Sequence, residues 1–129
     1  MDDKGRLIVP LRFRSLLGQR VYITKGIDGC LFLYPEHGYI EFYETISDGG
    51  DTELIRFFTS SESVIDSQGR VAVPINLRKW ADIPESGEVT LVGVGRRVEI
   101  WNREAWERYN AEELTNEAIK NSMRQIGLA

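Results

Sequence analysis

The chain has 129 residues, of which 42% are hydrophobic and 28% charged, a composition typical of one compact globular unit or two small ones. Its apolar runs are far shorter than the roughly 20 residues of a membrane span, and no apolar stretch follows the charged N-terminus as in a secretory signal. With one cysteine and one histidine, it has no pair for an internal disulfide, too few soft ligands for a zinc site and a poor basis for nucleophilic catalysis. We therefore expect a cytoplasmic protein that is not an enzyme and holds no metal or cofactor.

The charges are unevenly distributed along the chain, although the net charge is only −4. Residues 1–25 carry six basic and two acidic side chains, and residues 66–80 carry three basic side chains and one acidic one. Residues 36–62, in contrast, carry seven acidic side chains and one basic one. Because the local distribution matters more than the net charge for binding a polyanion, an acidic chain of this kind remains compatible with nucleic acid as a partner.

The first predicted elements occur twice. Residues 2–14 align with residues 66–78 at a constant offset of 64, and the Asp, Gly, Arg, Pro and final Arg positions coincide. The match resumes between residues 21–23 and 89–91, and Tyr34, Tyr39 and Phe42 then align with Trp101, Trp106 and Tyr109. Self-similarity of this kind indicates one structural unit, about 64 residues long, that is present twice.

Each unit begins with a turn of the form Asp-x-x-Gly-Arg, in which the carboxylate can accept backbone N–H groups and the glycine can adopt a positive φ. The aliphatic residues 7–9 and 71–73 then predict a buried strand, and the following proline predicts the first turn of a short helix. In the first unit Phe13, Leu16 and Leu17 form one apolar helical face, which ends at Gly18.

A hairpin and a helix complete each unit. The predicted hairpins pair residues 21–25 with 30–34, and residues 89–94 with 98–101. The first closing helix has an apolar face of Tyr39, Phe42, Tyr43 and Ile46, and the second begins after Asn102, a favourable N-cap. Between the units we expect a short helix around residues 54–58 and a strand within residues 59–65; the C-terminal tail is at most a polar helix.

These elements predict an α+β protein of two pseudo-equivalent halves. The predicted boundaries are residues 1–47 for the first unit, 48–59 for a connecting helical segment, 60–110 for the second unit and 111–129 for a C-terminal helical tail. The strand expected before the Asp66 turn has no counterpart before Asp2. Since a lost strand would leave an unpaired sheet edge, we favour an incomplete start of the chain over a first unit that has lost its first strand.

The doubled Asp-x-x-x-Arg motif, each copy inside a Gly-Arg-strand-Pro unit, resembles the MraZ proteins, which share the AbrB-like (SpoVT-AbrB) swapped-hairpin fold. The resemblance covers about residues 2–110 and includes the stretches 29–35, 56–58, 91–95 and 99–101. It implies two tandem AbrB-like half-barrel units, of the double-psi or swapped-hairpin type, packed with short helices. The chain departs from the family pattern before the first Asp, where the strand is absent, and after Pro35, where Gly38 leads us to expect a short, weakened helix.

The resemblance also implies a bacterial transcriptional regulator. Members of the family bind direct repeats in the promoter of their own division and cell-wall operon, and they assemble into rings. We therefore expect double-stranded DNA and further copies of the chain as partners, in a homo-oligomeric ring that is an octamer or larger. We expect no membrane and no small-molecule substrate, and a location in the cytoplasm at the nucleoid.

By the same resemblance, the DNA-reading loops are residues 2–6 and 66–70. The guanidinium groups of Arg6 and Arg70 can bind a phosphate or a guanine edge bidentately, Lys4 suits a phosphate, and Gln68 suits a phosphate or an adenine. The residues expected to position these loops are Asp2, Gly5, Asp66 and Gly69. Alternatively, both arginines are ordinary turn residues that pair with the aspartates four positions earlier; their duplication at constant spacing favours the DNA-binding interpretation.

The remaining candidates are weaker. The cations on the short helices after the prolines are either further DNA contacts or part of a solvated helix face; these are Arg12, Arg14, Arg78 and Lys79. We interpret Arg96 and Arg97 as residues of a hairpin turn, Cys30 as a core residue, His37 as a surface residue, and Trp101 and Trp106 as core or subunit-interface aromatics. An antitoxin-like protein-interaction module of the same fold is the alternative function, and no residue constellation supports an enzyme.

Overall fold

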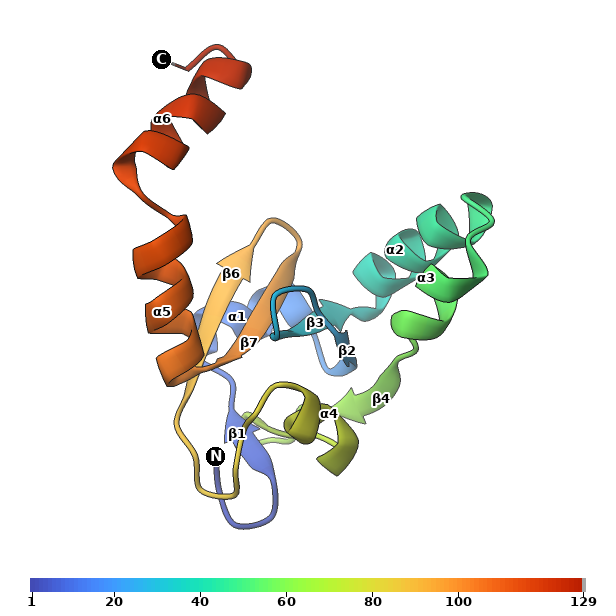
Figure 1. Ribbon diagram of the computed structural model, residues 1–129. Coiled ribbons are helices and arrows are strands. Elements are labelled where there is room, and N and C mark those ends of the chain that lie inside the picture. Colours follow the sequence, from blue (N-terminus) through green and yellow to red (C-terminus); the bar gives the residue numbers. More distant parts are fainter. Residues whose placement is uncertain (129) are drawn as a thin grey trace.

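The computed structural model describes residues 1–128, so Ala129, the last residue of the expected C-terminal tail, lies outside the described part. A five-stranded antiparallel sheet and a separate two-stranded ribbon form the centre, with short helices around them (Figure 1). The α+β class is therefore confirmed. In chain order the elements are β1 (Arg6–Ile8), α1 (Leu11–Leu17), β2 (Arg20–Lys25), β3 (Leu31–Pro35), α2 (Glu36–Asp48), α3 (Thr52–Phe57), β4 (Ser61–Val64), β5 (Arg70–Ala72), α4 (Ile75–Trp80), β6 (Val89–Val94), β7 (Arg97–Asn102), α5 (Arg103–Glu113) and α6 (Asn116–Gln125).

The two halves of the chain interleave their strands. The large sheet has the order β4-β2-β3-β7-β6, and both predicted hairpins, β2–β3 and β6–β7, lie in it side by side. Two of the contacts within this sheet join strands of different halves, namely β3 with β7 and β2 with β4. Strands β1 and β5 pair in the ribbon, where Arg6 lies opposite Ala72 and Ile8 lies opposite Arg70. The duplicated motif of each half therefore folds against its copy in the other half.

A core of aliphatic side chains lies between the ribbon and the large sheet. Alternate residues of the ribbon point into this core, and they meet buried leucines from α1 and α4 and buried residues of the hairpins. Its fully or almost fully buried members include Leu7, Val9, Leu17, Ile23, Leu33, Val71, Val73, Leu77, Val98 and Ile100. Because burying one such side chain contributes about 1.5–3 kcal/mol, this core fixes the ribbon firmly on the sheet.

A second core is built from aromatic residues. It joins β3, β7 and the segment after α3 to the faces of α2 and α5; its buried members are Cys30, Phe32, Tyr34, Phe58 and Trp101. Trp101 packs against Trp106 with ring centroids 5.3 Å apart and against Tyr109 at 5.0 Å. The predicted core positions of Cys30 and Trp101 are thereby confirmed.

Helices α1 and α4 begin at equivalent places. Pro10 has φ −56° and ψ 147°, and Pro74 has φ −55° and ψ 146°, so the same local geometry starts both helices. Leu17, the last residue of α1, and Leu77, the third residue of α4, are both buried. Leu16, which we predicted on the buried face, is 44% exposed. This prediction was wrong because so short a helix turns only one narrow side, carrying Phe13 and Leu17, towards the core.

Helix α2 contradicts the expectation of a short segment after Pro35, because it runs over 13 residues despite Gly38. Tyr39, Phe42 and Ile46 pack against the aromatic core. This tertiary packing outweighs the low helix propensity of one glycine. Tyr43 was predicted on the same face but is 43% exposed.

The C-terminal tail consists of two helices. Helix α5 begins, as predicted, after Asn102, whose side-chain oxygen accepts the backbone N–H of Ala105 at 3.0 Å. The chain leaves the helix after Glu113, and Thr115 caps α6 by accepting the N–H of Ala118 at 3.2 Å. Helix α6 projects away from the body (Figure 1). None of the helices in residues 1–128 is both long enough and apolar enough to cross a membrane.

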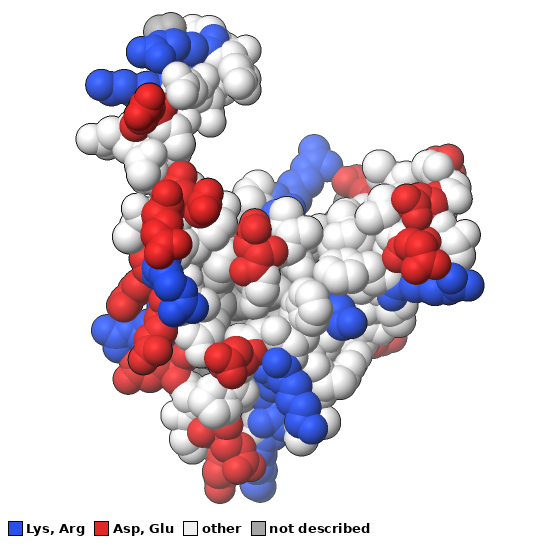
Figure 2. Space-filling model, in the orientation of Figure 1, with Lys and Arg blue, Asp and Glu red and all other residues white. Residues whose placement is uncertain are grey.

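Basic and acidic side chains are interspersed on the visible face. Acidic side chains line α5 with basic ones among them, and at the lower end, where β1 lies, basic and acidic side chains lie beside each other (Figure 2).

Candidate nucleic-acid interface

The first duplicated loop is closed by one carboxylate. Asp2 Oδ1 accepts the backbone N–H groups of Lys4 and Arg6, both at 2.9 Å, and Asp2 Oδ2 accepts Nε of Arg6 at 2.9 Å. Gly5 has a φ of 73°, which a side chain would disfavour. These hydrogen bonds and this φ are the ones that the predicted Asp-x-x-Gly-Arg turn requires.

The second loop repeats these bonds. Asp66 Oδ1 accepts the N–H groups of Gln68 and Arg70 at 2.9 Å, and Oδ2 accepts Nε of Arg70 at 2.8 Å. Gly69 has a φ of 80°. Two segments 64 positions apart thus adopt the same hydrogen-bonded conformation, because each contains the residues that this conformation needs.

Both aspartates are held in the charged form. The backbone N–H of Arg6 is the main cause that lowers the pKa of Asp2 below its usual value, and the backbone N–H of Arg70 has the same effect on the pKa of Asp66. Bonds from the arginine side chains act in the same direction. At neutral pH each loop therefore keeps an ionised carboxylate as the acceptor that orders it.

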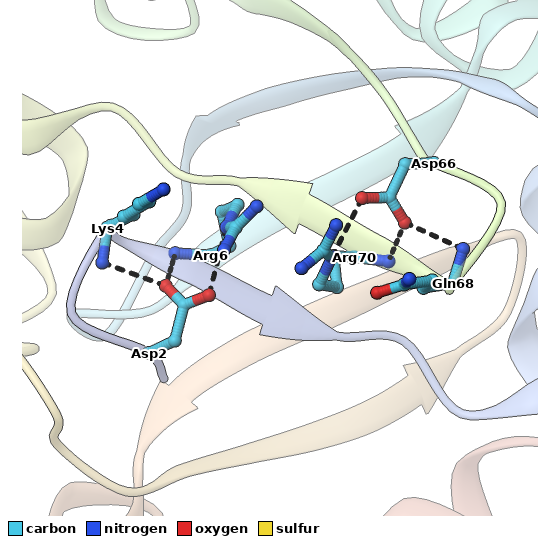
Figure 3. Close-up of polar contacts among 6 residues, drawn as sticks. All are labelled: Asp2, Lys4, Arg6, Asp66, Gln68 and Arg70. Atoms are coloured by element: carbon cyan, nitrogen blue, oxygen red, sulfur yellow. Dashed lines mark hydrogen bonds and ion pairs between the residues drawn. The ribbon is translucent and has the colours of Figure 1, made fainter.

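The two arginines share the outer face of the ribbon. Leu7 and Val71 point into the core, so the alternation of a strand turns Arg6 and Arg70 outward. Arg6 lies opposite Ala72 and therefore diagonal to Arg70, a relation that corresponds to roughly 7–8 Å between backbone positions. In Figure 3 the two side chains lie near the middle of the ribbon, with a loop at each end.

Each arginine keeps its terminal nitrogens available. The bonds from Arg6 to Asp2 and from Arg70 to Asp66 both use Nε, and the side chains are 28% and 30% exposed. The aspartate therefore fixes the direction of the guanidinium while leaving its Nη groups for an anion or a base edge. Lys4 and Gln68 are exposed beside them.

The cations of the short helices occupy two different environments. Arg12 is exposed, with its guanidinium 4.6 Å from the centre of the Phe13 ring, and Lys79 is exposed as well. Arg14 and Arg78 are instead half-buried. Arg14 Nε donates to the carbonyl of Val9 at 2.7 Å, and Arg78 Nε donates to the carbonyl of Val73 at 3.0 Å. This difference was not predicted from the sequence, although Arg14 and Arg78 share a Pro-x-x-x-Arg spacing that Arg12 and Lys79 lack.

One family of known proteins matches almost the whole chain. A family model described as "MraZ protein, putative antitoxin-like" matches residues 1–54 and 57–127. The chain belongs to the MraZ family. The expected absence of enzymatic activity is confirmed by this membership, because the family is one of transcriptional regulators.

Relatives of the MraZ family cover most of the chain. It is 46% identical over 119 residues to the "Transcriptional regulator MraZ" of Desulforamulus reducens, an alignment that covers 87% of this chain and 82% of that protein. The regulator of the same name from Moorella thermoacetica gives the same identity and coverage. The one from Alkaliphilus oremlandii is 40% identical over 136 residues, covering 99% of this chain and 94% of the relative.

Other chemistry-bearing residues lie apart from the loops. His37 is exposed on α2 and contacts Glu41 at 2.9 Å, as expected of a surface residue. Arg96, at the hairpin turn, pairs with Glu41 at 2.8 Å. Arg97, also predicted in the turn, is the first residue of β7, where it pairs with the buried Glu99 at 2.8 Å. Within residues 1–128, no group of three His, Cys, Asp or Glu side chains is arranged to hold a metal ion.

Proposed function

We propose that this chain is a sequence-specific DNA-binding transcriptional regulator that reads DNA with its two Asp-x-x-x-Arg loops. The observation that carries the proposal is the pair of arginines, Arg6 and Arg70, each held through Nε by an aspartate on the same outer face of the ribbon. An ordinary Asp–Arg ion pair on the surface gives no reason for the motif to occur twice on one face. Two guanidinium groups held in fixed orientations can instead bind phosphates or base edges that repeat along DNA.

A two-stranded ribbon has the dimensions of the DNA major groove. With the outer face of β1 and β5 in the groove, the Nη groups of Arg6 and Arg70 meet guanine edges or phosphates. Lys4 contacts a phosphate, and Gln68 contacts a phosphate or an adenine. Because these two residues occupy the same loop position, the two halves read different features of the DNA.

The fold that we propose for this function is the AbrB-like swapped-hairpin fold with two repeats in one chain. Its support is the interleaving of the halves, in which β1 pairs with β5 and β4 joins the hairpin of the other half. A swapped arrangement of this kind explains how two loops that are far apart in sequence come to the same ribbon.

We further propose that several copies act together as a ring, an octamer or larger, on direct repeats in the promoter of the chain's own division operon. One chain offers few cations to DNA, and linking several weak contacts raises the affinity through a high effective concentration. Exposed apolar side chains support self-association; they include Ile40 and Tyr43 on α2, Leu54 on α3, and Ile119 and Met123 on α6. The regulator then works in the cytoplasm, bound to the nucleoid.

An antitoxin-like protein-interaction module is the second candidate. The observation in its favour is α6, which projects from the body with Ile119, Met123 and Ile126 exposed. Co-purification of a small toxin with the full chain supports this candidate, and its absence together with DNA binding supports the first.

Fluorescence anisotropy tests the proposal. The full chain is titrated onto a labelled duplex from the region upstream of its own gene, and onto a scrambled duplex of equal composition. We expect a clear preference for the native duplex. With about eight phosphate contacts from several subunits, the affinity should fall roughly 10³–10⁵-fold between 50 and 200 mM salt. Equal binding to both duplexes at every salt concentration contradicts the proposal.

A further inference from the structure

The half-buried arginines of α1 and α4 lie against the loop of the opposite half. A Cβ atom placed on Gly5 would lie 2.8 Å from Cζ of Arg78, and one placed on Gly69 would overlap the guanidinium of Arg14. Arg14 belongs to the first half and Gly69 to the second, while Arg78 and Gly5 show the reverse. The two contacts are therefore reciprocal and cross between the halves.

Hydrogen bonds continue each contact into the backbone. The guanidinium of Arg14 donates through Nε to the carbonyl of Val9, and the N–H of Val9 donates to the carbonyl of Gly69 at 2.8 Å. In the mirror arrangement Arg78 donates to Val73, whose N–H donates to the carbonyl of Gly5 at 2.9 Å. Arg14 and Arg78 are thus each hydrogen-bonded to the residue, Val9 or Val73, whose own N–H is bonded to the loop glycine of the opposite half.

The loop glycines are buried although their neighbours are exposed. Gly5 and Gly69 are both buried, whereas Lys4 and Gln68, one position earlier, are exposed. The guanidinium groups lie where a side chain on either glycine would be, so they cover the inner side of the loop. Both glycines consequently serve two purposes, since they permit a positive φ and leave room for the arginine.

We propose that Arg14 and Arg78 are positioning residues, each of which holds the DNA-binding loop of the opposite half. Arg14 acts on residues 66–70 and Arg78 acts on residues 2–6, so the orientation of the two loops is set jointly. The part of this inference that concerns DNA rests on the proposed function. An arginine that only contacts a phosphate would differ from a positioning arginine in two respects. Its removal would affect no particular loop, and a lysine in its place would preserve DNA binding.

Hydrogen–deuterium exchange without DNA tests the crossing directly. The full-length chain is compared with Arg14→Ala, Arg14→Lys and the control Arg12→Ala, which changes an exposed cation on the same helix. We expect both Arg14 variants to increase exchange in peptides over residues 66–70 about 5- to 10-fold, as for a lost hydrogen bond, with residues 2–6 unchanged. Arg78→Ala should give the opposite pattern, and Arg12→Ala should change neither loop.

Three results would overturn the inference: faster exchange only in the loop of the variant's own half, equally faster exchange in both loops, or unchanged exchange in both loops. Circular dichroism and thermal unfolding verify that each variant is folded. Arg14→Lys keeps the charge and most of the side-chain volume, so it remains informative if Arg14→Ala unfolds.

DNA binding provides the second readout. On the native duplex we expect Arg14→Ala and Arg14→Lys to lose affinity alike, about 10-fold or more. The control for binding is Arg56→Ala, which removes an exposed arginine of α3, and it should stay within about 3-fold of the parent. Wild-type affinity in Arg14→Lys overturns the positioning role. If the parent chain itself shows no preference for the native duplex, the proposed function fails, while the exchange experiment still decides whether the arginines hold the opposite loops.

Discussion

Replacing Gly69 by alanine should destabilise the protein more than the same change at Gly50. Both glycines have a positive φ, 80° and 72°, so alanine costs about 1 kcal/mol at either position for its left-handed conformation. A Cβ on Gly50 meets nothing within 4 Å. A Cβ on Gly69 displaces the guanidinium of Arg14, whose 2.7 Å bond to the Val9 carbonyl is then lost, adding about 1–2 kcal/mol.

The assay is urea denaturation at equal protein concentration, since any self-association makes the apparent stability concentration-dependent. We expect Gly50→Ala to lose about 1 kcal/mol and Gly69→Ala about 2–3 kcal/mol of unfolding free energy. Only Gly69→Ala should also weaken binding to the native duplex. Equal destabilisation by the two changes, together with unaltered DNA binding, would refute the reasoning about the crowded glycine.

Three further predictions concern the loops and the core. The pKa values of Asp2 and Asp66 are lowered in the folded chain, so their contribution to stability is complete above about pH 4 and is lost as the pH falls through the lowered values. The double variant Asp2→Asn/Asp66→Asn should therefore show a weaker dependence of the unfolding free energy on pH in the acid range. An unchanged pH profile would contradict this prediction. Burial raises the pKa of the Cys30 thiol to about 12, so iodoacetamide at pH 8 should label the native chain far more slowly than the urea-unfolded chain, and equal rates would show an accessible thiolate. Glu99→Ala removes the carboxylate that accepts the indole N–H of the buried Trp101 at 3.0 Å and that pairs with Arg97. Urea denaturation should therefore show a loss of about 2–4 kcal/mol of unfolding free energy, and a smaller loss for Glu99→Gln. A loss below about 0.5 kcal/mol for Glu99→Ala would contradict the importance of these two contacts.

The loop conformation was predictable because its determinants lie within five consecutive residues. The carboxylate of Asp66, the N–H groups that it accepts and the glycine with positive φ all belong to residues 66–70. The hairpins and the Asn102 cap were predictable for the same reason, since strand alternation and capping depend on near neighbours.

Contacts between the halves were not predictable in this way. Both copies of the motif are visible in the sequence, but neither the pairing of Arg6 with Ala72 nor the packing of Arg14 on Gly69 can be predicted from them. These contacts depend on which strands pair across about half of the chain, which no local pattern specifies. The length of α2 was misjudged for a related reason, because its aromatic face is stabilised by β3 and the segment after α3 rather than by helix propensity.

The proposed role of the two loop arginines is tested most directly by comparing two double variants on the native upstream duplex. Arg6→Ala/Arg70→Ala removes the two outward arginines of the ribbon, and Arg56→Ala/Arg96→Ala removes two exposed arginines elsewhere with the same change in net charge. We predict that the first variant remains folded and associated but binds the native duplex no better than the scrambled one, while the second keeps its preference. Native-like preference in a folded Arg6→Ala/Arg70→Ala protein would contradict the account.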